Sequence, residues 1–425
     1  MGSMISLGVG KMEIDWGKNN MFRDHSALFT DGDIKDIPYY YAGLEENEII
    51  TEYHEGFSRN LSLIKRRLDL LGYSLKKVEK LYNDALYECS EYGYNLDLSF
   101  DSFSKMLREL DISKIDTPGF SVNYEENGYD FGEFVQRCIL PEEEIYNRLL
   151  QSCSADKREV RYALEIFFEN FDPYIILRLL AENPSCKNLD VYWSYADVVE
   201  GGWVSKEDIS KPLPRTEKIM IVTEGSSDTF ILQKTIESLY PDISDFFQFI
   251  DMHDNYPFTG TGSLYNFCCG LMKININNKV IVIFDNDVAG LEKYNKLKAM
   301  TQLDNMLITK LPDHEDFISV ETIGPLGTEQ GNINGTAVSK SQGCTFLFSV
   351  AKTQCYYECF LDFSKKSPQV RWANYVEQSG KYQGSLVNKD SYVREFKKAN
   401  LTDGSYDTSK LIFLVDYLLE QWIEY

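Results

Sequence analysis

Two acidic segments of this sequence each follow an apolar run, and they carry the residues best suited to do chemistry. The run 219–222 leads to Glu224, and the run 280–284 leads to Asp285 and Asp287. Each run predicts a buried parallel strand, and open α/β sheets place their reactive groups at the carboxyl ends of such strands. Carboxylates that converge there would repel one another unless a divalent cation lay between them. The spacing therefore predicts a magnesium site.

The residue types suit the cleavage of phosphodiester bonds. That reaction needs an activated water and relief of charge on the phosphate, and one or two magnesium ions supply both. Magnesium prefers oxygen ligands, so Asp and Glu are suitable and His and Cys are not. The chain has only four histidines, which disfavours a histidine-based hydrolase. Asp228, one helical turn after Glu224, is a further metal ligand or a residue that favours the helix dipole.

The elements that must position these residues change in kind along the chain. A hairpin is expected over residues 4–16, and helical periodicity follows around 57–72, 75–88, 100–110, 142–150 and 158–170. A proline-containing linker at 205–215 separates this part from an alternation of strands and helices, which predicts a parallel α/β domain. We therefore predict three domains: a mainly α-helical N-terminal domain (1–210), an α/β catalytic domain (217–325) and an α+β C-terminal extension packing on it (326–425).

Composition limits the compartment and the partners. No apolar run approaches the roughly 20 residues that a membrane-spanning helix needs, so no membrane partner is expected. Nine cysteines without metal-type spacing indicate free thiols in a reducing, cytoplasmic environment. The net charge of −23 argues against broad attraction to nucleic acid. A nuclease of this composition would need a local basic groove, a metal ion or a protein partner.

The acidic segments also carry a family resemblance. Glu224-Gly225-Ser226-Ser227-Asp228, followed by Asp285-Asn286-Asp287, resembles the Toprim domain of topoisomerases, primases and OLD-type nucleases, and is closest to the nuclease branch. The resemblance covers residues 217–325. It implies that Asp285 and Asp287 bind Mg²⁺, with Mn²⁺ as a substitute, and that Glu224 is a further ligand or a general acid/base.

The nuclease branch has one more acidic group after the next strand. The strand-like run 306–309 leads to Asp313 and Glu315, and the resemblance makes Glu315 our candidate metal ligand. The alternatives are a turn role for Asp313 after Pro312 and a solvated surface role for Glu315.

The N-terminal half resembles the region found ahead of such domains in bacterial HEPN/Toprim-associated proteins. The resemblance rests on Leu7-Gly8-Val9-Gly10, on the segment 13–19 and on the segment 67–73. HEPN ribonucleases use an Arg and a His four to six residues apart, whereas Arg23 and His25 are too close. We therefore expect a regulatory, sensing or oligomerising region. Residues 15–19 form either a ligand-contacting loop or a structural turn.

The segment after the α/β domain resembles the tail that accompanies this pairing. Arg371, Lys381 and Lys389 are its candidates for phosphate contacts, because a cation near the scissile group would offset developing charge. A surface role in solubility is the alternative for each of them.

The leading hypothesis is an Mg²⁺-dependent Toprim nuclease, a metal-dependent phosphodiesterase acting on DNA or RNA. The resemblance implies a toxic effector of bacterial anti-phage defence that forms homo-oligomers and responds to a regulatory protein or a phage trigger. The alternative is a non-catalytic Toprim module that binds a nucleotide or a partner as a structural subunit.

Overall fold

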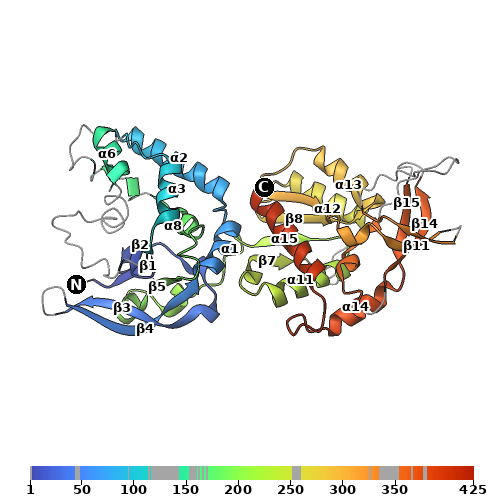
Figure 1. Cartoon of the computed structure of the whole chain (residues 1–425), viewed down its shortest axis with the longest axis horizontal. Coiled ribbons are helices and arrows are strands. Elements are labelled where there is room, and N and C mark those ends of the chain that lie inside the picture. Colours follow the sequence, from blue (N-terminus) through green and yellow to red (C-terminus); the bar gives the residue numbers. More distant parts are fainter. Residues whose placement is uncertain are drawn as a thin grey trace. The chain divides into compact units, whose positions relative to one another are not determined.

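The computed structural model divides into two compact units, Met1–Leu213 and Pro214–Tyr425 (Figure 1). The described residues are 2–425 without 44–47, 94, 113–114, 116–142, 153–159, 161–162, 165–166, 169–170, 251–259, 325–326, 335–353, 365–366 and 377–380. Within this described part, no helix combines the length and the apolar character needed to cross a membrane.

The first unit contains a five-stranded antiparallel sheet in the order β2-β1-β5-β4-β3. Its strands are β1 (Met4–Val9), β2 (Met12–Lys18), β3 (Ile34–Ala42), β4 (Ile49–Asn60) and β5 (Asp190–Ser194). The alternating buried residues of β1 and β2 face a core that the helices share. Strand β5, far along the chain, inserts between β1 and β4, so the sheet depends on non-local pairing.

Helices accompany this sheet. They are α1 (Leu61–Leu71), α2 (Leu75–Glu91), α3 (Phe100–Glu109), α6 (Glu143–Ser152), α8 (Pro173–Leu180), α9 (Ala196–Glu200) and α10 (Lys206–Ile209), with 3-10 turns η1 (Ser26–Leu28) and η2 (Asp31–Asp33). Helix α1 ends at Gly72 in the left-handed region (φ 102°), where glycine is favoured. Every residue of α8 is buried.

The expectation of a mainly helical first domain with one short hairpin needs correction. The hairpin is one edge of a larger sheet, and β3 and β4 add a second, longer hairpin to it. Both strands contain residues with high β-propensity, such as Tyr39, Tyr41 and Ile49. The first half of β4 is largely exposed, so its residues do not alternate between apolar and polar. A search for hydrophobic periodicity misses such strands.

The second unit is built on a four-stranded parallel sheet in the order β10-β8-β6-β7. Its strands are β6 (Ile219–Val222), β7 (Phe247–Phe249), β8 (Lys279–Phe284) and β10 (Met306–Lys310). The chain runs from β6 outward to β7 and then returns to β8 on the other side of β6. This reversal is a topological switch point, and ligands of open α/β sheets bind outside the carboxyl ends of the strands there.

Helices and short 3-10 turns accompany these strands. They are α11 (Ser226–Leu239), α12 (Thr261–Lys273), α13 (Val288–Lys298) and α15 (Ser409–Glu424), with η6 (Ser244–Phe246) and η7 (Glu315–Phe317). Leu264 of α12 and Leu297 of α13 share a core with Val280, Val282 and Phe284 of β8. Strand β8 is buried on both faces, as its continuous apolar run predicts.

A second sheet and two further helical elements complete this unit. The sheet has the order β12-β11-β14-β15, formed by β11 (Val320–Gly324), β12 (Gly327–Gly331), β14 (Gln369–Val376) and β15 (Lys381–Leu386). The helical elements are η8 (Tyr357–Phe360) and α14 (Lys389–Lys398). The short strands β9 (Asn286–Asp287) and β13 (Gln354–Cys355) pair antiparallel, which places η8 beside the acidic end of β8.

Candidate functional site

Five buried carboxylates gather at the switch point of the parallel sheet, and we call them the acidic cluster. They are Glu224, Asp228, Asp285, Asp287 and Glu358. Their charges act on one another, and burial combined with this repulsion raises the pKa of Asp285 well above its usual range. Strands β6 and β8 are direct neighbours in register, so the residues that follow them are brought to the same edge of the sheet.

Glu224 is oriented by two hydrogen bonds. The backbone N–H of Asp285 donates to Oε1 at 2.9 Å, and the hydroxyl of Thr261, the first residue of α12, donates to Oε2 at 2.6 Å. Burial raises the pKa of Glu224, and the charge of Asp287 adds to this, although the two hydrogen bonds act in the opposite direction. Glu224 therefore points its carboxylate across the edge of the sheet and not into solvent.

Asp287 caps helix α13. Its Oδ1 accepts a hydrogen bond from the N–H of Gly290 at 2.7 Å, and burial raises the pKa of its carboxyl. Gly290 is required by close packing, since a Cβ there would clash with the backbone carbonyl of Asp285. The helix start thus fixes both aspartates of the segment relative to each other.

Asp285 lies at the centre of the cluster. Burial raises its pKa first, and the charges of Asp228, Glu224, Asp287 and Glu358 follow in that order. Its Oδ1 is buried and has no hydrogen-bond partner among the described residues. Burying such an atom costs free energy, so it invites a ligand that the protein chain does not supply.

Asp228 lies in the first turn of α11. It is buried, and burial followed by the charge of Glu358 raises its pKa to about 7. Gly225 leaves room for it, because a Cβ at that position would come within 3.0 Å of Asp228 Oδ2. The structural alternative for Asp228, a role limited to the helix dipole, does not account for its burial among other carboxylates.

No pattern in the sequence indicates Glu358 as a member of the cluster. This residue lies in η8, is fully buried, and has its Oε1 2.9 Å from Nζ of Lys389. Beyond this ion pair, neither carboxylate oxygen has a hydrogen-bond partner among the described residues. Tyr357 beside it is also fully buried, with no partner for its hydroxyl in the same part of the chain. No strand-like run precedes Glu358, so only the β9–β13 pairing brings it to the site.

The two acidic residues predicted after β10, Asp313 and Glu315, lie in different environments. Asp313 accepts a hydrogen bond from the side-chain amide of Asn286 at 2.8 Å and so lies beside it. Glu315 is instead exposed in η7, where it lines a cavity of about 530 Å³ together with buried Lys410. Glu315 is therefore not one of the buried carboxylates of the acidic cluster.

The three basic residues predicted to contact phosphate lie in different environments. Lys389 contacts the cluster through Glu358. Arg371 is exposed on β14 in the second sheet, and the side chain of Lys381 lies outside the part of the chain that the structure describes. Across the described residues, no three His, Cys, Asp or Glu side chains are already arranged to hold a metal ion. Side chains of the cluster would have to turn toward one another to do so.

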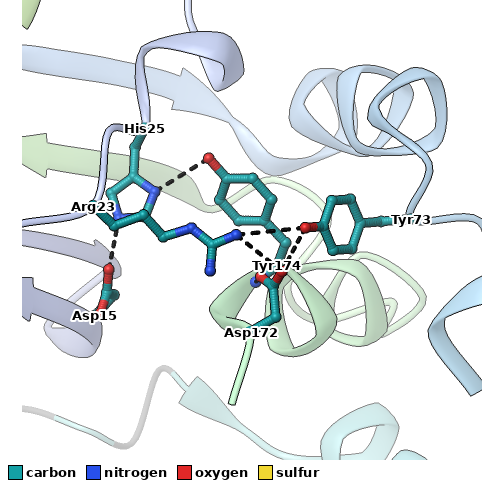
Figure 2. A network of polar contacts seen from close by, with 6 residues as sticks. All are labelled: Asp15, Arg23, His25, Tyr73, Asp172 and Tyr174. Atoms are coloured by element: carbon teal, nitrogen blue, oxygen red, sulfur yellow. Dashed lines mark hydrogen bonds and ion pairs between the residues drawn. The ribbon is translucent and has the colours of Figure 1, made fainter. Parts of the chain in front are cut away.

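The first unit holds a different polar network, which we call the polar clasp. Figure 2 shows its members, Asp15, Arg23, His25, Tyr73, Asp172 and Tyr174. The buried His25 ring lies 2.8 Å from Asp15 Oδ2 and 3.2 Å from the Tyr174 hydroxyl. Arg23 donates to Asp172 at 2.9 Å and to the Tyr73 hydroxyl at 3.4 Å.

The clasp ties the segment after β2 to the start of α8. Arg23 also lies over the ring of Tyr174, with 4.7 Å between its guanidinium carbon and the ring centroid. Since each charged group has an opposite or polar partner, the network is satisfied as it stands. This arrangement supports a structural role for the segment 15–25.

A family model described as HEPN/Toprim N-terminal domain 1 matches residues 1–217. No curated protein and no solved structure matches the chain significantly.

Proposed function

Because the chain belongs to the HEPN/Toprim N-terminal domain 1 family, we propose that its second unit is an Mg²⁺-dependent Toprim-type nuclease. Its substrate would be a phosphodiester bond of DNA or RNA. The name of the family pairs this N-terminal domain with HEPN and Toprim modules, and the second unit has the parallel sheet that a Toprim module requires. The proposal depends on whether the residues of the acidic cluster suit a divalent cation.

One observation carries the proposal: the buried Oδ1 of Asp285, without a partner among the described residues, lies at the centre of four other carboxylates. An all-oxygen set of this kind is the donor set that Mg²⁺ and Mn²⁺ prefer. A protein that needed only stability would not bury this much like charge at a switch point. The residues therefore fit a divalent cation.

The cluster residues would divide the work. Asp285 and Asp287 would hold the ion, with Glu224 as a further ligand or as general acid/base. When bound, the ion would activate a water and offset charge on the phosphate. Glu224 is already oriented by Thr261 and by the Asp285 N–H, so it can hold or accept a proton at a fixed position.

The decisive experiment measures cleavage of single- and double-stranded DNA and RNA with Mg²⁺, with Mn²⁺ and with EDTA. We expect cleavage only with metal, and its loss in Asp285→Asn and Asp287→Asn. Glu315→Gln is the matched control. It removes one exposed charge with little change of shape and should leave cleavage unchanged.

The alternative, a non-catalytic module that binds a nucleotide or a partner, makes a different prediction. Under it, Mn²⁺ would raise the melting temperature of the wild type, but no substrate would be cut. Cleavage that persists in Asp285→Asn at the wild-type rate would also refute the proposed site, since it would point to a contaminating nuclease.

We also propose that the protein acts in anti-phage defence, with a partner or trigger that controls access to the acidic cluster. The net charge of −23 supports such control, because it opposes unassisted approach of nucleic acid. A phage-plating assay on cells expressing wild type or Asp285→Asn tests this role, and equal plating would contradict it. Light scattering of the purified chain tests the expected homo-oligomer.

A further inference from the structure

A cavity of about 530 Å³ in the second unit is separate from the acidic cluster. Its lining, as far as the structure describes it, includes no carboxylate of that cluster. The buried residues of the lining are Phe317, Val320, Ile333, Cys359, Leu386 and Lys410. One charged side chain thus lies among apolar walls, in a space of the size that holds a small organic molecule.

The ammonium of Lys410 lacks a hydrogen-bond acceptor. Lys410 is the second residue of α15, and only 9% of its side chain is exposed. Its Nζ lies 3.7 Å from Oδ2 of Asp316, too far for a hydrogen bond, and 5.4 Å from the centroid of the Phe363 ring. Its charge also acts on Asp362 and Asp407. The ammonium therefore has opposite charges around it but makes no hydrogen bond to the described residues.

This environment selects one kind of ligand. Three N–H donors of a buried ammonium are costly to leave without acceptors. Asp316, Asp362 and Asp407 already offset its charge. Glu321 also lines the cavity and would repel an anion. An uncharged oxygen acceptor, such as an amide carbonyl, therefore suits the cavity better than a carboxylate or a phosphate.

A purely structural lysine would explain less. A lysine that serves only as an ion-pair partner normally donates to a carboxylate at about 2.7–2.9 Å. The separation of 3.7 Å from Asp316 leaves the donors of Lys410 available to an acceptor that the described residues do not supply. A ligand in the cavity accounts for both the burial of the ammonium and the absence of such a bond.

The cavity shares one element with the acidic cluster. Cys359 of η8 lines the cavity, and Glu358 directly before it belongs to the cluster. Phe360 of the same turn packs against Phe317 of the cavity wall, with 5.2 Å between the ring centroids. A molecule in the cavity would therefore contact the turn that positions Glu358.

We propose that the cavity is a regulatory site for a small uncharged molecule that carries an amide-like carbonyl group on an apolar body. The carbonyl oxygen accepts from Lys410, and the body fills the apolar part of the cavity. By packing against Cys359, the molecule holds η8, and with it Glu358, in place and so tightens metal binding at the acidic cluster. The binding goes beyond the proposed function, whereas the regulation rests on it.

The binding test uses three probes of nearly the same shape: benzamide, which is uncharged, benzoate, which is an anion, and benzamidine, which is a cation. Titrations of the full chain at pH 7.5, followed by saturation-transfer NMR, compare their affinities. We expect benzamide to bind about tenfold or more tightly than either charged probe, because only benzamide offers Lys410 an acceptor without added charge. Tighter binding of benzoate would overturn the proposed ligand class.

Two variants locate the bound probe. Lys410→Met removes the donor and should weaken benzamide binding about tenfold or more. Ile318→Trp should block the cavity, which Ile318 lines while being 57% exposed, so the fold tolerates the change. Ile274→Trp is the matched control, since Ile274 is 70% exposed and does not line the cavity, and it should bind benzamide like wild type. Circular dichroism confirms that each variant is folded.

Two results would show that the cavity holds only water. One is a wild type that binds none of the three probes. The other is wild-type affinity for benzamide in both folded variants, Lys410→Met and Ile318→Trp.

The regulatory test measures Mn²⁺ affinity by isothermal titration calorimetry with and without saturating benzamide. We expect about fivefold tighter Mn²⁺ binding with benzamide, and Mn²⁺ should tighten benzamide binding by the same factor. Equal Mn²⁺ affinities would overturn the regulation but leave the binding site in place. A wild type that binds no Mn²⁺ would overturn the proposed function, and the regulation with it, but not the binding of benzamide.

Discussion

The acidic cluster of the second unit and the polar clasp of the first unit arrange their charged groups in opposite ways. In the clasp, Asp172 pairs with Arg23, and Asp15 pairs with His25. In the acidic cluster, the ammonium of Lys389 acts on Glu224, Asp228, Asp285 and Glu358, and Asp285 Oδ1 has no partner within the described residues. Both networks tie elements together, but only one of them is left with an excess of charge.

This difference distinguishes a structural network from a ligand site. A satisfied network stabilises the fold and gains nothing from an added ion. An unsatisfied one lowers the stability of the metal-free protein and recovers it when a cation binds. Variants of the two regions should therefore have opposite effects on stability and on metal binding.

The largest effect is expected for Asp285→Asn. Cleavage should fall on the order of 10²–10³-fold, because the central ligand of the metal is lost. The metal-free variant should nevertheless be more stable than wild type by about 1–3 kcal/mol, since one of five repelling carboxylates is neutral. Urea unfolding without Mn²⁺ measures the stability of the metal-free variant, and unfolding with Mn²⁺ measures the stabilisation that the ion provides. A metal-free variant less stable than wild type would show that Asp285 is structural.

The next effect concerns the backbone that supports the cluster. Gly290→Ala should destabilise the protein by about 3 kcal/mol and weaken Mn²⁺ binding, because the added Cβ meets the carbonyl of Asp285. Gly270→Ala is the matched control, since a Cβ there meets nothing within 4 Å in helix α12. The control should be neutral or slightly stabilising. Equal effects of the two changes would contradict the close packing.

A smaller loss is expected in the clasp. Asp172→Asn keeps an oxygen to cap α8 but removes the charge that pairs with Arg23, so it should cost about 1–2 kcal/mol. Mn²⁺ binding should not change. Asp24→Asn, which removes one exposed charge next to Arg23 in the sequence, serves as the control and should unfold like wild type. A change in Mn²⁺ affinity would mean that the two networks are coupled.

The smallest effect is a pH dependence from Glu13, a carboxylate of β2 outside the clasp. Burial raises its pKa from 4.5 to about 7, a hydrogen bond with Ser6 opposes this, and the charge of Asp15 adds to it. Below pH 4.5 both folded and unfolded states hold the proton, so the group contributes nothing. Between pH 4.5 and 7 only the folded state keeps it, so stability should fall as pH rises.

Glu13→Gln should flatten this decline, which urea unfolding from pH 4.5 to 7.5 would show. Parallel curves for the variant and the wild type would mean that Glu13 titrates normally. The comparison between the two regions would then be sharper. Among the described residues, every carboxylate with a pKa raised this far would belong to the acidic cluster.

Three of the four parallel strands of the second unit could be predicted from the sequence, and the short β7 was not. Apolar runs at 219–222, 280–284 and 306–309 are β6, β8 and β10 within one residue. Such strands can be recognised in the sequence because a strand buried on both faces needs apolar side chains at every position. The antiparallel strands β3 and β4 were missed, since an exposed strand face relaxes that requirement.

The same reasoning found the part of the acidic cluster that follows these strands. Glu224, Asp285 and Asp287 are adjacent in sequence to elements that the pattern reveals. Glu358 and the contact of Lys389 with it could not be found in this way, because no local pattern surrounds them. Glu315 was predicted because it follows β10 closely in the sequence, and the structure has it exposed in η7.

The sequence by itself determined which residue types could bind a hard cation and which strands would deliver them to one edge of a sheet. Both follow from local chemistry: apolar runs form buried strands, and carboxylates end them. Only the tertiary structure decided that a fifth carboxylate and a lysine join the cluster. That choice depends on the pairing of β9 with β13 and on the anchoring of α14, contacts between residues that are distant in the chain.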